Sequence, residues 1–170
     1  MTQGTYRIIA ALITISLFAL ALPLTGRVAR ASASEGVSER TIEGVWRTAV
    51  APRDCQTDAI GPFGIRGVFT FHQGGTMAEY GIGPGSSPAL RSPGHGIWQR
   101  ERGWQEYSFA FGYYRYEANG AFAGSQRVRA TLRLASNGDE FTGKSVVEVF
   151  DVNDNLVGTF CAASVGMRFQ

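Results

Sequence analysis

The sequence predicts an all-β domain, an antiparallel up-and-down barrel of about eight strands that is held by one disulfide. Several segments alternate apolar and polar side chains, which is the pattern of half-buried strands. Glycine- and asparagine-rich turns separate these segments at regular intervals. A single pair of cysteines, Cys55 and Cys161, lies near the two ends of the domain. Together these features favour closure of the sheet on itself.

The first 33 residues have the pattern of a secretory signal peptide. Arg7 precedes an apolar run over residues 8–24, and small residues around Ala31 and Ala33 provide a cleavage site. A membrane anchor of similar length is the competing interpretation. We expect cleavage, which predicts a secreted or periplasmic protein with no membrane attachment. Residues 34–41 then form a short polar leader, and residues 42–170 form a single β-barrel domain.

Signal cleavage also changes the charge of the chain. The signal segment contains three arginines and no acid, so its removal takes the net charge from +2 to −1. Nucleic-acid binding needs a strongly basic surface, and the mature chain is not basic overall. We therefore predict no nucleic-acid partner. The oligomeric state is left open.

The strands follow from the alternation in chain order. In residues 125–134, for example, Val128, Ala130 and Leu132 face one way while Arg127 and Arg129 face the other. No segment after the signal peptide shows a sustained helical period. The predicted strands are 44–52, 65–73, 75–82, 95–102, 104–116, 123–134, 140–150 and 155–168.

The cysteine pair connects the two ends of this meander. In an exported protein, two cysteines are expected to form a disulfide. A Cys55–Cys161 bond would join the segment after the first strand to the last strand, and these are neighbours in a closed meander. The bond therefore supports a barrel over an open sheet.

Two short motifs resemble the lipocalin and calycin group. Gly44-Val45-Trp46 lies on the first strand, and Arg168 lies near the end of the last strand. The resemblance implies that Trp46 plugs one end of the barrel and that Arg168 packs over it. A guanidinium can stack on an indole face while it donates to nearby carbonyls. The segment LRSPGHGIW, residues 90–98, also resembles uncharacterised exported bacterial proteins and implies no activity.

The sequence gives little support for metal, calcium or phosphate chemistry. His72 and His95 have no companion ligands at zinc spacing. The segment DVNDN, residues 151–155, begins like a calcium loop but lacks the glycine and the glutamate that complete one. No helix follows the glycine-rich segment 81–96, which therefore matches no phosphate loop. We predict no metal and no cofactor.

A stripe of aromatic side chains provides the candidate ligand site. Alternation places several rings on one strand face, with two further candidates close by in sequence. These residues line an interior ligand cavity if the barrel is hollow, and they fill the interior if it is not. Residues 81–96 form the long connection expected to gate the mouth. The predicted ligand-binding residues are Tyr107, Phe109, Phe111, Tyr113, Trp98 and His95.

The leading functional hypothesis is an exported lipocalin-like protein that binds or carries a small apolar or aromatic molecule. One alternative is an isomerase or cyclase on the same scaffold, for which the proton-transferring candidates are His95, Tyr113, Tyr114 and Glu117. Another is an exported protein-binding module such as a protease inhibitor. A third is an outer-membrane barrel, which would need a lumen wide enough for the arginines of residues 127–133. No catalytic residue is assigned.

Overall fold

A computed structural model describes residues 40–170 of the chain. The predicted signal peptide, residues 1–33, and most of the polar leader lie outside the described residues. Within residues 40–170, no helix is long and apolar enough to cross a membrane. The described residues include the whole of the predicted barrel segment, residues 42–170.

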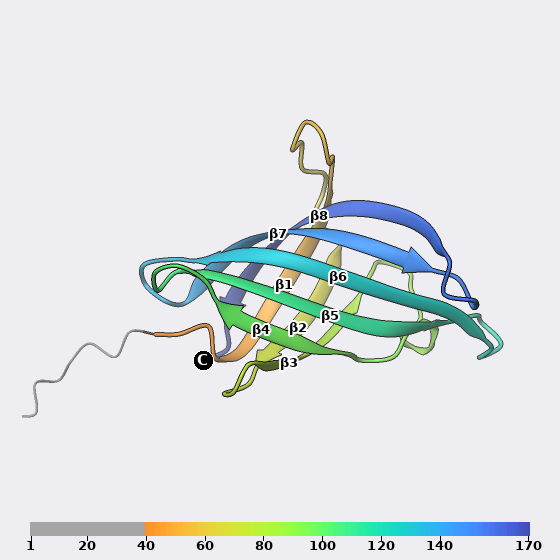
Figure 1. Cartoon of the computed structure of the whole chain (residues 1–170), viewed down its shortest axis with the longest axis horizontal. Coiled ribbons are helices and arrows are strands. Elements are labelled where there is room, and N and C mark those ends of the chain that lie inside the picture. Colours follow the sequence, from red (N-terminus) through yellow and green to blue (C-terminus); the bar gives the residue numbers. More distant parts are fainter. Residues whose placement is uncertain (1–39) are drawn as a thin grey trace, which may run out of the picture. The chain divides into compact units, whose positions relative to one another are not determined.

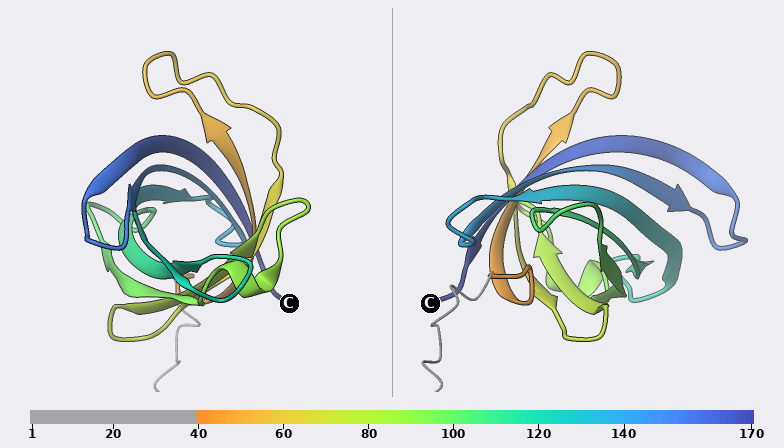
Figure 2. Two further views of the ribbon diagram at one scale, coloured as in Figure 1. Left: turned by 90° about the vertical axis from the view of Figure 1, so that its right-hand side faces the viewer. Right: turned by 60° about the vertical axis from the view of Figure 1, so that its left-hand side comes forward.

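Eight antiparallel strands follow one another around a closed barrel (Figures 1 and 2). Each strand pairs with the next along the chain, and the last pairs with the first, which confirms the predicted fold class. A short 3₁₀ turn, η1 (Pro88–Leu90), interrupts the connection after the third strand. The strands are β1 (Gly44–Arg53), β2 (Ile65–Phe71), β3 (Thr76–Ile82), β4 (Gly94–Arg100), β5 (Glu106–Tyr116), β6 (Phe122–Leu134), β7 (Glu140–Phe150) and β8 (Leu156–Arg168).

The strand boundaries differ most from the prediction between β4 and β5. The sequence predicts a one-residue break there, but the structure has a five-residue turn over 101–105. Glu101 donates its backbone N–H to the carbonyl of Glu106 at 2.8 Å, and the Arg100 Nε donates to the carbonyl of Gly103 at 2.8 Å. These bonds satisfy polar groups of the turn that would otherwise lack ladder partners.

The alternation seen in the sequence separates the inside of the barrel from its outside. On β6, Val128, Ala130 and Leu132 are buried, whereas Arg129 and Arg133 are exposed. The outward arginines pair with acids on neighbouring strands: Arg129 with Glu148 and Arg133 with Glu106. Exposed pairs of this kind contribute little to stability, so burial of the inner face holds the wall together.

The meander places each connection between strands at one of the two ends of the barrel. Alternate connections of an up-and-down barrel lie at the same end, so the connections fall into two sets. The plug end has the start of β1, the end of β8 and the turns 72–75, 101–105 and 135–139. The mouth end has the connections 54–64, 83–93, 117–121 and 151–155. The left view of Figure 2 looks toward the mouth end.

Trp46 and Arg168 meet at the plug end. The Arg168 guanidinium carbon lies 4.3 Å from the centroid of the fully buried Trp46 ring. The guanidinium also donates to the carbonyls of Thr41 and Glu43, each at 2.6 Å, and to that of Gly138. The Trp46 Nε1 in turn donates to the carbonyl of Ile42 at 2.8 Å. One arginine therefore ties the entry of β1 and the β6–β7 turn to the last strand.

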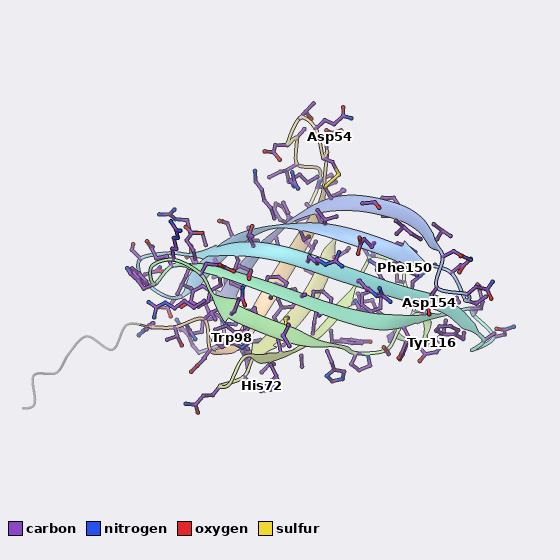
Figure 3. All side chains as sticks on the ribbon, viewed as in Figure 1. Asp54, His72, Trp98, Tyr116, Phe150 and Asp154 are labelled. Atoms are coloured by element: carbon purple, nitrogen blue, oxygen red, sulfur yellow. A yellow bond between two sulfur atoms is a disulfide. The ribbon has the colours of Figure 1, made fainter. Side chains whose placement is uncertain are left out.

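The predicted disulfide is present and fastens the connection between β1 and β2. Cys55 and Cys161 are bonded, with their Cα atoms 5.3 Å apart. The connection 54–64 projects from the barrel wall near Asp54 (Figures 1 and 3). Asp58 of this connection pairs with Lys144 on the outer face of β7 at 2.7 Å, and it also pairs with Arg53. The Cys55–Cys161 disulfide thus links the projecting connection covalently to β8.

We expect the disulfide to contribute substantially to stability. It closes a loop with a sequence separation of 106 residues. Loss of this constraint should lower the free energy of unfolding by roughly 2–5 kcal/mol, measured by urea denaturation of the Cys55→Ser/Cys161→Ser variant. Reducing agent should destabilise the native chain but leave the double variant unchanged. Free thiols on both cysteines of the exported native protein would contradict this prediction.

A second prediction concerns the stacked pair at the plug end. Trp46→Ala should cost roughly 3–5 kcal/mol of unfolding free energy because it removes a buried indole. The Arg168→Ala variant should be destabilised too, and the two losses should be non-additive because the side chains touch. Arg133→Ala is the matched control, since Arg133 lies on the outer wall, and its effect should add to that of Trp46→Ala. Strict additivity for Trp46 and Arg168 would refute their coupling.

Candidate functional site

The barrel encloses a small cavity on the mouth side of its aromatic core. Its volume is about 110 Å³. Drug-sized ligands occupy pockets of roughly 300–1,000 Å³, so this cavity holds only a small molecule or one group of a larger molecule. Its walls come from seven strands and from Arg91 of the β3–β4 connection.

Aromatic side chains form the floor of the cavity. Phe69 of β2 packs edge-on against Phe109 and Phe111 of β5, with ring centroids 5.7 and 5.9 Å apart. Tyr113 continues the stripe and stacks on Phe111 at 6.4 Å. Edge-to-face and offset contacts are the preferred arrangements of aromatic rings. The predicted stripe therefore packs the centre of the barrel, and its mouth-side members also line the cavity.

Polar side chains form much of the remaining wall. Thr48, Glu79 and Ser164 are buried and line the cavity together with Gln126 and Ser145. Within residues 40–170, the Thr48 Oγ1 is buried and has no hydrogen-bond partner. A buried hydroxyl without a partner costs about 1–3 kcal/mol. A ligand that accepted or donated a hydrogen bond here would remove that cost.

Glu79 carries a carboxylate into the interior, and Arg91 covers it. The Arg91 Nη1 donates to Glu79 Oε1 at 3.2 Å, and its Nη2 donates to Oε2. The same guanidinium lies 3.6 Å from the Tyr113 ring centroid and donates to the carbonyl of Gly81 at 2.9 Å. Arg91 thus reaches from the mouth connection into the barrel and forms the roof of the cavity.

Glycines make room for the Glu79 carboxylate. A Cβ at Gly81 would lie 2.9 Å from Glu79 Oε1, and a Cβ at Gly94 would lie 2.6 Å from Oε2. Any larger residue would displace the carboxylate from this position. Gly81 of β3 and Gly94 of β4 therefore leave space for the Glu79 side chain.

Burial controls the protonation of the interior groups. Desolvation raises the pKa of Glu79 above its ordinary value of 4.5, and the Arg91 charge opposes the rise. Burial likewise raises the pKa of the Tyr113 hydroxyl, which the nearby Arg91 and Arg115 charges oppose and Glu79 reinforces. Protonated Glu79 would be a weaker partner for Arg91, so the roof contact depends on pH.

The structure divides the six predicted ligand-binding residues among three places. Phe109, Phe111 and Tyr113 line the cavity. Tyr107 and Trp98 pack against each other toward the plug end, with ring centroids 5.9 Å apart, and the Trp98 Nε1 donates to the carbonyl of His72 (Figure 3). These two residues do not line the cavity. His95 lies exposed on the outer wall, opposite Gly112 of β5.

The candidate proton-transferring residues do not meet at the cavity. Tyr113 lines it, whereas Tyr114 is exposed on the opposite face of β5. Glu117 lies in the β5–β6 turn, where its backbone N–H donates to the carbonyl of Ala121. His95, Tyr113 and Tyr114 instead line one hollow of about 680 Å³, which is separate from the cavity.

The sequence analysis did not identify the polar part of the site. Glu79 could have been found, because it alternates with Met77 and Gly81 on the core face of a predicted strand. Such an acid on an apolar face indicates a paired or functional carboxylate. Arg91 carries no such signal, because it lies in an aperiodic connection.

Larger hollows lie on the outer wall. One of about 560 Å³ is lined by outward side chains such as Ile97, Ser108 and Arg129. Its charged groups are already paired, as with Arg129 and Glu148. Within the described part of the chain, no three histidine, cysteine or acidic side chains come together in a way that could hold a metal ion. Asp151 of the DVNDN segment accepts hydrogen bonds from Asn153 and Asn155 within its own turn.

Comparison with known proteins does not assign this site. No protein-family model matches the chain, and no curated protein matches it in sequence. The closed eight-stranded barrel is consistent with the lipocalin-like architecture that the two motifs imply. Function must therefore be argued from the cavity itself.

The buried carboxylate predicts a specific pH dependence of stability. Because the pKa of Glu79 is raised in the folded state, its contribution to stability is fully present below its ordinary pKa of 4.5. This contribution is lost as the pH rises through the higher pKa of the folded state. The free energy of unfolding of the native chain should therefore fall, relative to that of Glu79→Gln, as the pH rises from about 4.5 toward neutrality.

Glu101 provides the control for this experiment. It is exposed, and its pKa is lowered by hydrogen bonds from Ser108 and Gln99. The stability difference between the native chain and Glu101→Gln should therefore be nearly constant above about pH 4.5 and should decrease as the pH falls below it. Parallel pH profiles for the native chain and Glu79→Gln would show that the carboxylate is not desolvated.

Proposed function

We propose that this chain is an exported binding protein that holds a small molecule, or one ring-sized group of a larger molecule, in the cavity near its mouth. The supporting observation is the combination of an aromatic floor with a buried Thr48 hydroxyl that has no partner among residues 40–170. Binding sites typically combine apolar walls with a few placed polar groups. The disulfide Cys55–Cys161 fits an oxidising compartment and supports export.

The cavity walls refine the class of ligand. A purely apolar molecule would contact Phe69, Phe109 and Phe111 but would leave the Thr48 hydroxyl unsatisfied. The cavity of about 110 Å³ is smaller than a dry engineered cavity of about 150 Å³ that accepts benzene, so it holds at most a single small ring. We therefore expect an amphipathic ligand, with a ring on the floor and a polar group toward the mouth.

The experiment uses benzyl alcohol as a neutral, ring-sized probe. Titration of the native chain, followed by amide chemical shifts in NMR, should perturb Thr48, Phe109, Phe111 and Tyr113. Gly81→Ala places a methyl group beside the Glu79 carboxylate inside the cavity and should weaken binding severalfold. Phe109→Ala should enlarge the cavity and allow larger rings to bind.

Gly112→Ala is the matched control. It adds the same methyl group on the outer face of β5, where the nearest atom outside the neighbouring residues is 3.4 Å away, so probe affinity should not change. Melting temperatures establish that each variant is folded. If the native chain excludes every small probe while Phe109→Ala creates binding, the aromatics are only packing and this function is wrong.

The second candidate function is a protein-binding module, and the projecting connection 54–64 favours it. The Asp54 carboxylate accepts from the backbone N–H groups of Gln56 and Thr57 at 2.8 and 2.7 Å, which stiffens the turn. The disulfide at Cys55 fixes its base. A rigid projecting segment loses little entropy on binding, so it suits insertion into a partner's cleft.

A further inference from the structure

Two arginines occupy paired backbone positions at the mouth of the barrel. Arg91 of the β3–β4 connection and Arg115 of β5 are paired through an isolated antiparallel bridge. Arg115 follows Phe111 and Tyr113 at intervals of two residues, so it continues the inward face of β5. Like charges directly opposite each other on neighbouring strands repel, so this pairing costs stability unless an anion compensates it.

Within residues 40–170, Glu79 is the only carboxylate that forms an ion pair with either arginine. Glu79 is bound by Arg91 through both of its oxygens. Arg115 makes no ion pair within residues 40–170. Asp151, in the β7–β8 turn of the same end, is bound by the N–H groups of its own turn. Among the side chains of Arg91, Arg115 and Glu79, Glu79 pairs with Arg91, and the positive charge of Arg115 has no ion-pair partner within residues 40–170.

The charge of Arg115 acts on the cavity wall. Arg91 and Arg115 both oppose the rise that burial causes in the pKa of Tyr113, which lines the cavity. The backbone of the segment that carries Arg91 is also held in place, because Ser92 donates its N–H to the carbonyl of Tyr114 at 3.0 Å and accepts from the Tyr114 N–H at 3.0 Å. Arg91 thus lines the cavity, and Arg115 is held next to it by the backbone bridge.

We propose that the cognate ligand is a small monoanionic carboxylate whose ring or short apolar body occupies the cavity and whose carboxylate lies between Arg91 and Arg115. This inference rests on the proposed function and adds the charge of its ligand. One negative charge balances the one uncompensated guanidinium. A guanidinium can bind a carboxylate through two parallel hydrogen bonds, which gives the orientation as well as the attraction. The apolar body of the ligand then contacts Phe109 and Phe111, as the ring of benzyl alcohol would.

Benzoate, benzamide and benzylammonium test the charge preference with nearly the same ring and size. The native chain should bind benzoate about tenfold more tightly than benzamide, by calorimetry or NMR titration, because a charge-assisted hydrogen bond replaces a neutral one. Arg115→Gln should remove this preference while leaving benzamide affinity unchanged. Arg115→Lys should retain part of the preference because it keeps the charge. Added salt should weaken benzoate binding more than benzamide binding.

Arg127→Gln is the matched control. Arg127 lies on the outer wall of β6, where its guanidinium packs over the Phe150 ring at 4.3 Å, and its loss should not affect the preference. Equal affinity for benzoate and benzamide would overturn the anion inference but leave small-molecule binding intact. Tighter binding of benzylammonium would overturn it and identify Glu79 as the determinant. Failure of all three probes would overturn both the inference and the proposed function.

Discussion

Closure of the sheet on itself is the constraint on which the rest of the structure depends. β1 pairs with β8 over eight residue positions, from Trp46 opposite Arg168 to Arg53 opposite Cys161. The arginine stack stands at one end of this seam, and the disulfide stands at the other. Without the seam, both strands would be free edges, and the interior would be open to water. Once β1 and β8 are paired, the alternation along each strand determines which side chains point into the barrel.

The limited width of the eight-stranded barrel then determines what its interior can contain. Eight strands leave space only for packed side chains or one small ligand. Large rings such as Trp46, Phe71 and Phe141 occupy the plug half. Toward the mouth, glycines stand beside the buried Glu79 carboxylate. The buried Glu79 carboxylate therefore lies in the half of the barrel where small residues leave room for it.

The sequence was sufficient to predict the strands, their order and the disulfide, because these depend on period-two alternation and on a single cysteine pair. The site was only partly predictable. His95 and Trp98 lie three residues apart on one strand, so the same alternation places them on opposite faces, and they could not share a cavity. Arg91 could not be found, since its position depends on a bridge between an irregular connection and Arg115 rather than on any local pattern.

The seam between the first and last strands also has a consequence for how the chain folds. Neighbouring strands can pair as local hairpins, but β1 must wait for β8, and the contact between Cys55 and Cys161 spans 106 residues. Such distant contacts slow folding, because the entropy of closing the intervening chain is lost before the contact stabilises it. A chain in which β1 and β8 have not yet paired exposes two unpaired strand edges, and such edges favour aggregation. The last step of folding, rather than the strands themselves, would then set the yield of native protein.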